Sequence, residues 1–232
     1  MACLLFAASP ASSWAEEAAG KPFKLSVGNY SYSDGTHAQD TNLRWQDETT
    51  HAWYGYYSDP NFGHQSRVGI DKTIDIADNV SVQPSLQAAT GGFVGGSVNL
   101  QFGHPWFGLM GWGRTNLRPY FNLNFDPNDA ITLGVGWAGE RQQSVLLSVV
   151  SDDRLHTGQK DWHLLTRTPL SDDVRLTLDV LHKTGLGDAG PVNGWGLSTT
   201  LDFPDWSIRL ARDPMQNFSA INATRVTVAF RF

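Results

Sequence analysis

The sequence has a single cysteine, Cys3, and no apolar run that approaches the roughly 18 residues a membrane-spanning helix needs. These absences exclude a fold held by disulfides and a bundle of transmembrane helices. An excess of basic charge is also missing, because the formal net charge is -6 at pH 7. A nucleic-acid-binding protein is therefore not expected. The rigidity of the chain must come from hydrogen bonding and packing.

Aromatic residues and glycine are well represented in the remaining composition. The chain has 9 Trp and 23 Gly, and 12% of its residues are aromatic, although the mean hydropathy is only -0.30. A membrane β-barrel has this combination, because its apolar residues alternate with polar ones instead of forming long runs. Most of the tryptophans and several tyrosines lie near the ends of alternating segments, which predicts aromatic girdles at two membrane interfaces. They include Trp45, Trp53, Tyr54, Tyr56, Tyr57, Trp106, Trp112, Trp137, Trp162, Trp195 and Trp206.

Residues 1–15 have the pattern of the end of a secretory signal peptide. Leu4 to Ala8 form a short apolar core, and Ser13-Trp14-Ala15 fits a cleavage site with small residues at its first and third positions. The basic region that usually precedes the apolar core is missing, which suggests a truncated start. Residues 16–232 contain no linker, so we expect one domain.

Alternating segments of about ten residues, separated by turn residues, follow from Pro22 to the end of the chain. Closure into an antiparallel barrel requires an even number of strands with both ends on the same side. Because the pattern yields fifteen segments, we expect fourteen strands, with twelve or sixteen as alternatives. The least certain places are the break at Gly91-Gly92, the turn at Glu140-Arg141 and the short segment 161–168. The segments are 23–33, 40–47, 50–58, 65–75, 80–90, 93–102, 106–113, 117–125, 130–138, 144–151, 161–168, 174–183, 192–202, 206–213 and 223–232.

The last segment places Thr224, Val226, Val228, Phe230 and Phe232 on one side of an extended strand. A chain that ends on an aromatic residue after this alternation resembles the closing strand of Gram-negative outer-membrane β-barrel proteins. The resemblance implies an all-β fold, a closed antiparallel transmembrane barrel in the outer membrane, in contact with its lipids and lipopolysaccharide. It also implies that Phe232, Phe230 and Val228 form the signal read by the barrel assembly machinery. The alternative is an edge strand of a soluble β-sandwich.

Most arginines fall on the opposite parity, which would face the interior of such a barrel. The predicted interior residues are Arg44, Arg67, Arg118, Arg167, Arg175, Arg209, Arg225, Arg231, Asp71 and Asp179. Two hypotheses follow. In the first, guanidinium groups line a narrow water-filled channel and favour small anionic solutes, a plan similar to that of small channels for acidic oligosaccharides. In the second, the arginines pair with interior acids and fill a barrel with a structural or adhesive role.

An enzymatic alternative rests on Phe62-Gly63-His64-Gln65-Ser66, because His64 and Ser66 share one face of a strand. The segment resembles the core motif of outer-membrane lipid A 3-O-deacylases, which implies a lipid-modifying hydrolase with Ser66 as nucleophile and His64 as base. Arg67 stands where that family has Asn, the motif lies early in the chain, and no acid is placed to orient His64. A non-enzymatic protein is therefore favoured.

No cofactor or metal is expected, because the other histidines lack ligand spacing and the glycine clusters do not open a helix. Two polar segments, 184–191 and 213–222, are expected to form loops at the outer mouth.

Overall fold

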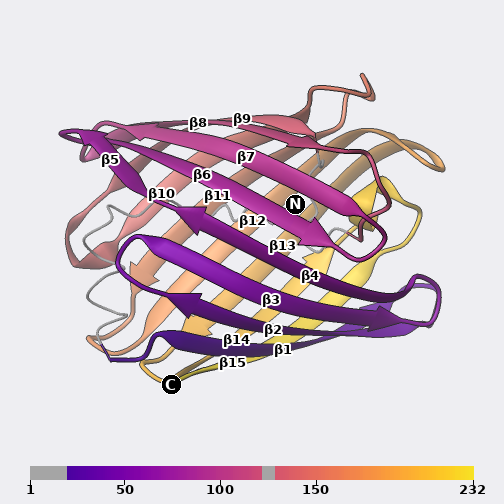
Figure 1. The fold of residues 1–232 in the computed structure, drawn as a ribbon, viewed down its shortest axis with the longest axis horizontal. Helices are drawn as coiled ribbons and strands as arrows, with labels where there is room; N and C mark the ends of the chain where they lie inside the picture. Colours follow the sequence, from indigo (N-terminus) through magenta and orange to yellow (C-terminus); the bar gives the residue numbers. More distant parts are fainter. Residues whose placement is uncertain (1–19, 122–128) are drawn as a thin grey trace.

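Fifteen strands form one antiparallel sheet in a computed structural model that describes residues 20–121 and 129–232 (Figure 1). Predicted segment 1–15 lies outside the described residues. The strands are β1 (Phe23–Tyr32), β2 (His37–Gln46), β3 (Thr50–Asp59), β4 (Gly63–Lys72), β5 (Ile74–Ala77), β6 (Val80–Ala89), β7 (Phe93–Phe102), β8 (Trp106–Thr115), β9 (Ala130–Ala138), β10 (Ser144–Asp152), β11 (Lys160–Pro169), β12 (Arg175–Gly187), β13 (Gly190–Asp202), β14 (Trp206–Asp213) and β15 (Ala223–Arg231). Two short 3-10 turns, η1 (Glu140–Gln142) and η2 (Gln216–Phe218), join β9 to β10 and β14 to β15. Within the described residues, no helix has the length and apolar character needed to cross a membrane.

The sheet closes on itself at two seams. β1 pairs with β15, and β4 pairs with β6. β5 continues the register of β4 along β6, because Asp71 lies opposite Ser85 and Ile74 lies opposite Val82. β4 and β5 are therefore one strand interrupted at Thr73, and the barrel has fourteen strands, which confirms the predicted fold class and number.

The segment predicted in error is 117–125. Its described part, residues 117–121, contains no strand, and its remainder lies outside the described residues. The three places considered least certain are correct, because Gly91-Gly92 turns between β6 and β7, η1 turns between β9 and β10, and β11 is a full strand. The predicted loop at 184–191 is wrong, since β12 and β13 extend through it to a tight hairpin. Residues 214–222 do form a loop, which contains η2.

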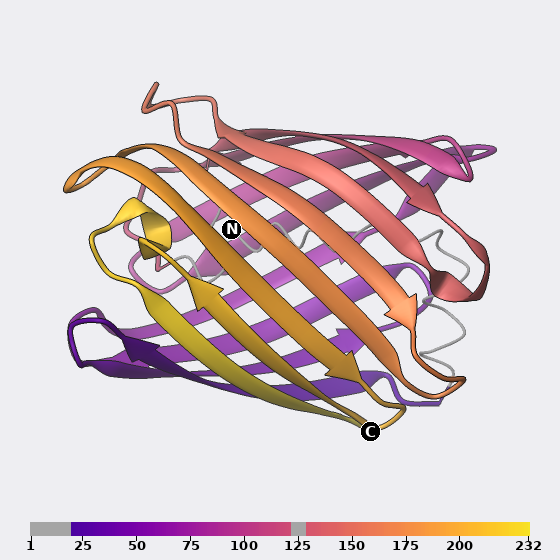
Figure 2. The same ribbon diagram turned by 180° about the vertical axis from the view of Figure 1, so that it is seen from behind.

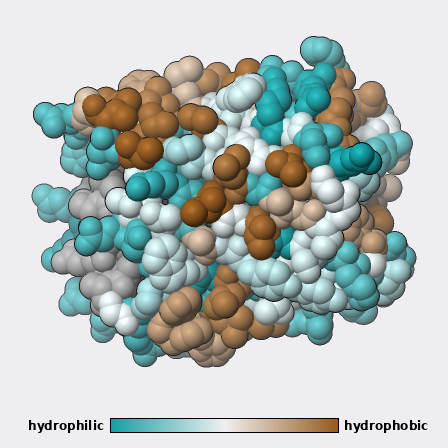
Figure 3. All heavy atoms as spheres, in the orientation of Figure 1, coloured by the Kyte–Doolittle hydropathy of each residue, from teal (hydrophilic) through white to brown (hydrophobic). Residues whose placement is uncertain are grey.

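Side chains alternate between the outer surface and the interior along each strand. In β15, Thr224, Val226 and Phe230 are exposed on the outside, whereas Arg225 and Ala229 are buried inside. Hydrophobic residues lie across the strands on the outer surface, and hydrophilic ones gather mainly at the two ends (Figure 3). An apolar exterior of this kind suits contact with lipid. Closure of the sheet also leaves no unpaired strand edge that would face the hydrocarbon.

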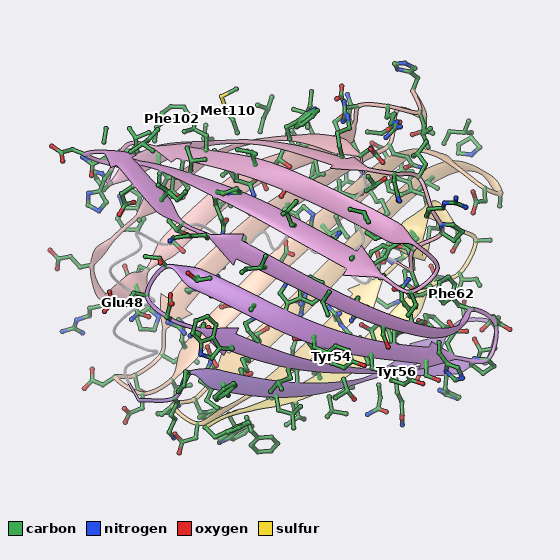
Figure 4. All side chains as sticks on the ribbon, in the orientation of Figure 1. Glu48, Tyr54, Tyr56, Phe62, Phe102 and Met110 are labelled. Atoms are coloured by element: carbon green, nitrogen blue, oxygen red, sulfur yellow. The ribbon has the colours of Figure 1, made fainter. Side chains whose placement is uncertain are left out.

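The two ends of the barrel differ. We call the end where β1 begins and β15 ends the terminal end, and the opposite end the loop end. Glu48 lies at the terminal end and Phe62 at the loop end, and Tyr54 and Tyr56 lie between them on the outer surface (Figure 4). The chain leaves β8 and enters β9 at the loop end, and the loop 214–222 lies at the same end (Figure 2).

Most predicted girdle aromatics lie outside, among them Trp106 and Trp195, which are 73% and 68% exposed. Two do not. Tyr57 is fully buried inside the barrel, and Trp53 lies so close over Gly69 that a Cβ atom there would be 2.3 Å from its ring. These two side chains therefore belong to the interior.

Candidate functional site

The interior holds most of the predicted arginines. Alternation along the strands directs Arg44, Arg67, Arg167, Arg175, Arg209, Arg225 and Arg231 inward, together with Asp71 and Asp179. Arg118 is the exception, because it lies in the connection after β8, is exposed and belongs to no strand. The prediction that Arg118 lies on a strand was therefore wrong, because residues 117–121 form no strand.

The interior also holds acids that the sequence analysis missed. They are Asp40, Asp59, Asp152, Asp161 and Asp202. Asp40 shares the inward parity of Arg44 in β2, and Asp202 shares that of Ser198 in β13. The signal was present in the alternation, but these residues lie near segment ends, where parity is hardest to read. The interior is consequently mixed in charge.

Arg67 on β4 forms an ion pair with Asp40 on β2 across the inner face of β3. The pair crosses the strand at Gly55, which lies opposite Arg67. A Cβ atom at position 55 would be 2.6 Å from Arg67 Nε, so the absence of a side chain there makes room for the guanidinium. Arg67 is 6% exposed, and one of its terminal nitrogens, Nη1, is buried without a partner among the described residues.

A second group of charges occupies the terminal end. Asp202 accepts hydrogen bonds from Arg175 at 2.9 Å and from Arg231 at 2.5 Å. Lys24 lies directly opposite both Arg44 and Arg231 in the register of β1 with its two neighbours. Basic side chains therefore line consecutive strands at this end.

The segment 116–121 after β8 folds against the inner wall. The ring of Phe121 stacks on Tyr57 with centroids 4.3 Å apart, and Tyr120 stacks on Phe93 at 4.1 Å. With its amide suitably oriented, Gln65 donates to Phe121 O at 3.3 Å and accepts from Phe121 N at 3.2 Å. Tyr57, Phe93 and Gln65 all face inward, so this segment narrows the interior at the loop end.

The environment of Tyr120 places it near the interior charges. Burial raises the pKa of the Tyr120 hydroxyl, the charge of Arg67 opposes that rise, and the charge of Asp40 adds to it. The ion pair of β4 and β2 and the segment 116–121 therefore meet at one level of the barrel. We call this level, made of Arg67, Asp40, Tyr57, Tyr120 and Phe121, the constriction.

The loop 214–222 also folds inward. Phe218 is 3% exposed, and its ring lies 5.3 Å from Lys183 Nζ. Lys183 donates to Asp213 at 2.7 Å, and both side chains are fully buried. This buried pair joins β12 to β14 beneath the loop.

An acid just before β9 ties three parts of the loop end together. Asp129 accepts from Thr115 N at 2.9 Å, from Thr115 Oγ1 at 2.7 Å and from Arg154 Nη1 at 2.9 Å. Burial alone would raise the pKa of Asp129, but these donors outweigh it, and the pKa lies below its ordinary value.

His64 and Ser66 lie on the outer face near the loop end, as the parity predicts. His64 Nδ1 is 3.2 Å from Ser58 Oγ, and Ser66 Oγ is 3.2 Å from Tyr54 OH. Within the described residues His64 has no acid partner and no hydrogen bond to Ser66. The arrangement therefore lacks the contacts of a base-activated nucleophile. No group of residues able to hold a metal ion occurs in the described ranges either.

Fold and interior together define a closed, fourteen-stranded antiparallel β-barrel with an apolar exterior and charged side chains on its inner wall. Outer membrane protein Omp33 of Acinetobacter baumannii has a similar fold, with a TM-score of 0.59 at 10% identity over 91% of this chain and 98% of that one. This likeness confirms the expected barrel fold. Two porins give lower scores: NanC has a TM-score of 0.48 and 14% identity over 90% of this chain and 100% of its own, and KdgM has 0.48 and 11% over 90% and 99%. No protein-family model matches the chain, and neither does any curated protein.

Proposed function

We propose that the protein is a narrow channel in the outer membrane of a Gram-negative bacterium that passes small hydrophilic solutes and favours anions. Integral barrels of this kind place both termini on the periplasmic side, so the terminal end would face the periplasm. Outer-membrane lipids and lipopolysaccharide would contact the apolar exterior.

The observation that carries this proposal is that inward-facing ionised groups reach water. Asp179, Asp40 and Asp202 retain 20%, 17% and 15% of their side-chain exposure, although they lie inside the closed sheet. Ionised groups sealed in a dry interior would carry a desolvation cost of several kcal/mol each. Hydration along the wall instead suits a water-filled path that narrows at the constriction.

The preference for anions rests on the balance of charge from the constriction to the terminal end. Basic residues there outnumber acids, and guanidinium groups attract anions and bind carboxylate or phosphate with two parallel hydrogen bonds. The inward basic residues are Lys24, Arg44, Arg67, Arg167, Arg175, Arg209, Arg225 and Arg231, and the inward acids are Asp40, Asp71, Asp179 and Asp202.

Planar-bilayer recording with the purified protein tests the proposal. The expected result is a conducting channel whose reversal potential in a potassium chloride gradient shows chloride preference. Arg209→Gln, on the inner face of β14, should weaken that preference, whereas Arg212→Gln, on the outer face of the same strand, should leave it unchanged. Absence of conductance, or cation preference in both variants and the parent, would exclude the proposal.

A second candidate, a closed barrel with a structural or adhesive role, is favoured by one observation. Several interior cations are held by acids, as in the pairs Arg67–Asp40, Arg175–Asp202 and Lys183–Asp213. Such networks can fill a small barrel. The same recordings distinguish the two candidates, because a filled barrel would not conduct even after Phe121→Ala widens the constriction.

A further inference from the structure

The charges of the interior are segregated along the barrel axis. Inward residues near the loop end are mostly acids, namely Asp59, Asp152, Asp161 and Asp213, with Lys183 among them. Inward residues near the terminal end are mostly basic, namely Lys24, Arg44, Arg167, Arg175 and Arg231, with Asp71 and Asp202 among them. The lumen therefore carries opposite net charge at its two mouths.

The basic end brings like charges together on neighbouring strands. Lys24 lies directly opposite Arg44 on one side and Arg231 on the other. Side chains directly opposite on antiparallel strands have Cβ atoms about 4.5–5.5 Å apart, and like charges there are destabilising. Asp202 accepts from Arg231 and from Arg175, so one carboxylate serves two guanidinium groups of this arc.

We propose that Lys24, Arg44, Arg175 and Arg231 form a binding site for a multivalent anion, a polycarboxylate or polyphosphate, at the terminal mouth of the lumen. The inference deepens the proposed channel function: a role of this site in transport rests on that function, whereas anion binding itself does not. The site lies at one end of the barrel. Arg231, Lys24 and Arg44 lie on the adjacent strands β15, β1 and β2, and Asp202 links Arg175 to Arg231. Several cations so placed match an anion with several charged groups better than a single chloride, because each group can have its own partner.

Acids in the turns of the terminal end do not cancel this site. These acids, Glu48, Asp172, Asp173 and Asp205 among them, lie in exposed turns beyond the strands, and Asp205 pairs with Lys21 there. Exposed charges are screened over a Debye length of about 8 Å at physiological salt, whereas charges on the inner wall are screened less. The acids at the loop end repel the same anion, so it would meet the site far more readily from the terminal side.

Calorimetric titration of the detergent-solubilised full chain with inorganic tripolyphosphate tests the site without requiring conductance. The expected result is saturable binding that weakens about tenfold or more in the double variant Lys24→Gln/Arg44→Gln. The matched control is Lys72→Gln/Lys160→Gln, which removes the same charge from exposed residues. Equal affinity in the parent and in Lys24→Gln/Arg44→Gln would overturn the proposal.

Bilayer recordings supply a second readout. Tripolyphosphate should block the current at a concentration at least about tenfold lower from one side than from the other, and Lys24→Gln/Arg44→Gln should abolish that asymmetry. Equal block from both sides would overturn the site at the terminal mouth while leaving the channel in place. Saturable binding by a protein that does not conduct would instead exclude the channel and retain the anion site.

Discussion

Arg67 lies flat over Gly55, and the two residues face each other across β3 and β4. A Cβ atom at position 55 would come within 2.6 Å of Arg67 Nε and 3.1 Å of Arg67 Cγ. Gly55 thus fixes the position of the guanidinium that pairs with Asp40 in the constriction. The pairing depends on a residue with no side chain.

Gly55→Ala should therefore displace Arg67 and break its ion pair with Asp40. The expected loss of stability is about 1–3 kcal/mol, the usual cost of forcing a side chain out of a packed site. Urea unfolding of the refolded barrel, followed by tryptophan fluorescence, measures it. Gly63→Ala is the comparison variant, because Gly63 has φ +87° and no atom within 4 Å of an added Cβ. Its loss of stability reports backbone strain alone, whereas Gly55 has no positive φ and Gly55→Ala reports the clash with Arg67. Equal stability of Gly55→Ala and the parent would contradict the role of Gly55.

Phe121→Ala should widen the constriction. The ring stack with Tyr57 contributes about 0.5–1.5 kcal/mol beyond its buried area, so its loss frees the segment 116–121 from the wall. We expect higher single-channel conductance in planar bilayers. Leu117→Ala is the matched control, because Leu117 lies in the same segment but is 52% exposed. A rise in conductance in both variants, or in neither, would show that the stack does not hold the constriction.

The sequence contained more information about the wall of the barrel than about its contents. Alternation and turn residues predicted the strands, because each strand needs only its own period and its own ends. The constriction could not be predicted from alternation and turn residues. Phe121 and Tyr120 belong to a segment that has the same alternation as a strand, yet they pack on Tyr57 and Phe93 instead of pairing with a neighbour. Contacts between a connection and a distant wall leave no local period.

The same reasoning explains the missed acids. Asp161 was included at the edge of a predicted segment, but its direct cross-strand partner, Lys183, became apparent only from the register of β11 with β12. Charge balance inside a barrel depends on registers around the whole circumference. A list of arginines with a common parity therefore overstated how positive the interior is.

Lys183→Met should destabilise the loop end strongly. It removes the ammonium group that donates to the buried carboxylate of Asp213 at 2.7 Å. Removing one member of a buried ion pair costs about 3–5 kcal/mol. Thermal unfolding in detergent provides the measurement, with Lys160→Met, an exposed residue on β11, as the control. If Lys183→Met and Lys160→Met unfolded at the same temperature as the parent, the buried pair would contribute nothing.

Acidification should loosen the contacts of Asp129. Because the pKa of Asp129 is lowered in the folded protein, its contribution to stability is fully present above the ordinary carboxyl pKa of about 3.9. That contribution is lost as the pH falls through the lower, folded-state pKa. The backbone amide of Thr115 donates a hydrogen bond to Asp129. Hydrogen exchange at this amide therefore reports the change.

The expected difference is between the parent and Asp129→Asn, measured at the same pH. The parent should be better protected at Thr115 at pH 6, and the advantage should shrink as the pH falls below the ordinary carboxyl pKa towards the lowered pKa of Asp129. Asp153→Asn is the control, because Asp153 pairs with Arg114 and makes no contact with Thr115 among the described residues. An advantage that persists unchanged over this fall in pH would show that charge on Asp129 is not responsible.

The closing strand allows assembly and stability to be tested separately. Phe232 stacks on Phe23 with ring centroids 5.8 Å apart, and the two residues exchange backbone hydrogen bonds of 3.0 Å at the β1–β15 seam. Phe232→Ala and Phe23→Ala remove the same stack and should lower the free energy of unfolding by similar amounts. Only Phe232→Ala changes the signal that the resemblance to closing strands of outer-membrane barrels implies for Phe232, Phe230 and Val228.

We therefore expect both variants to refold in detergent with similar stability, and only Phe232→Ala to accumulate poorly in the outer membrane of cells. Heat-modifiable migration on gels measures folded barrel in both settings. If Phe23→Ala assembled as poorly as Phe232→Ala, the defect would come from a weakened seam rather than a lost signal. If both assembled normally, neither the stack nor the terminal aromatic residue would limit insertion.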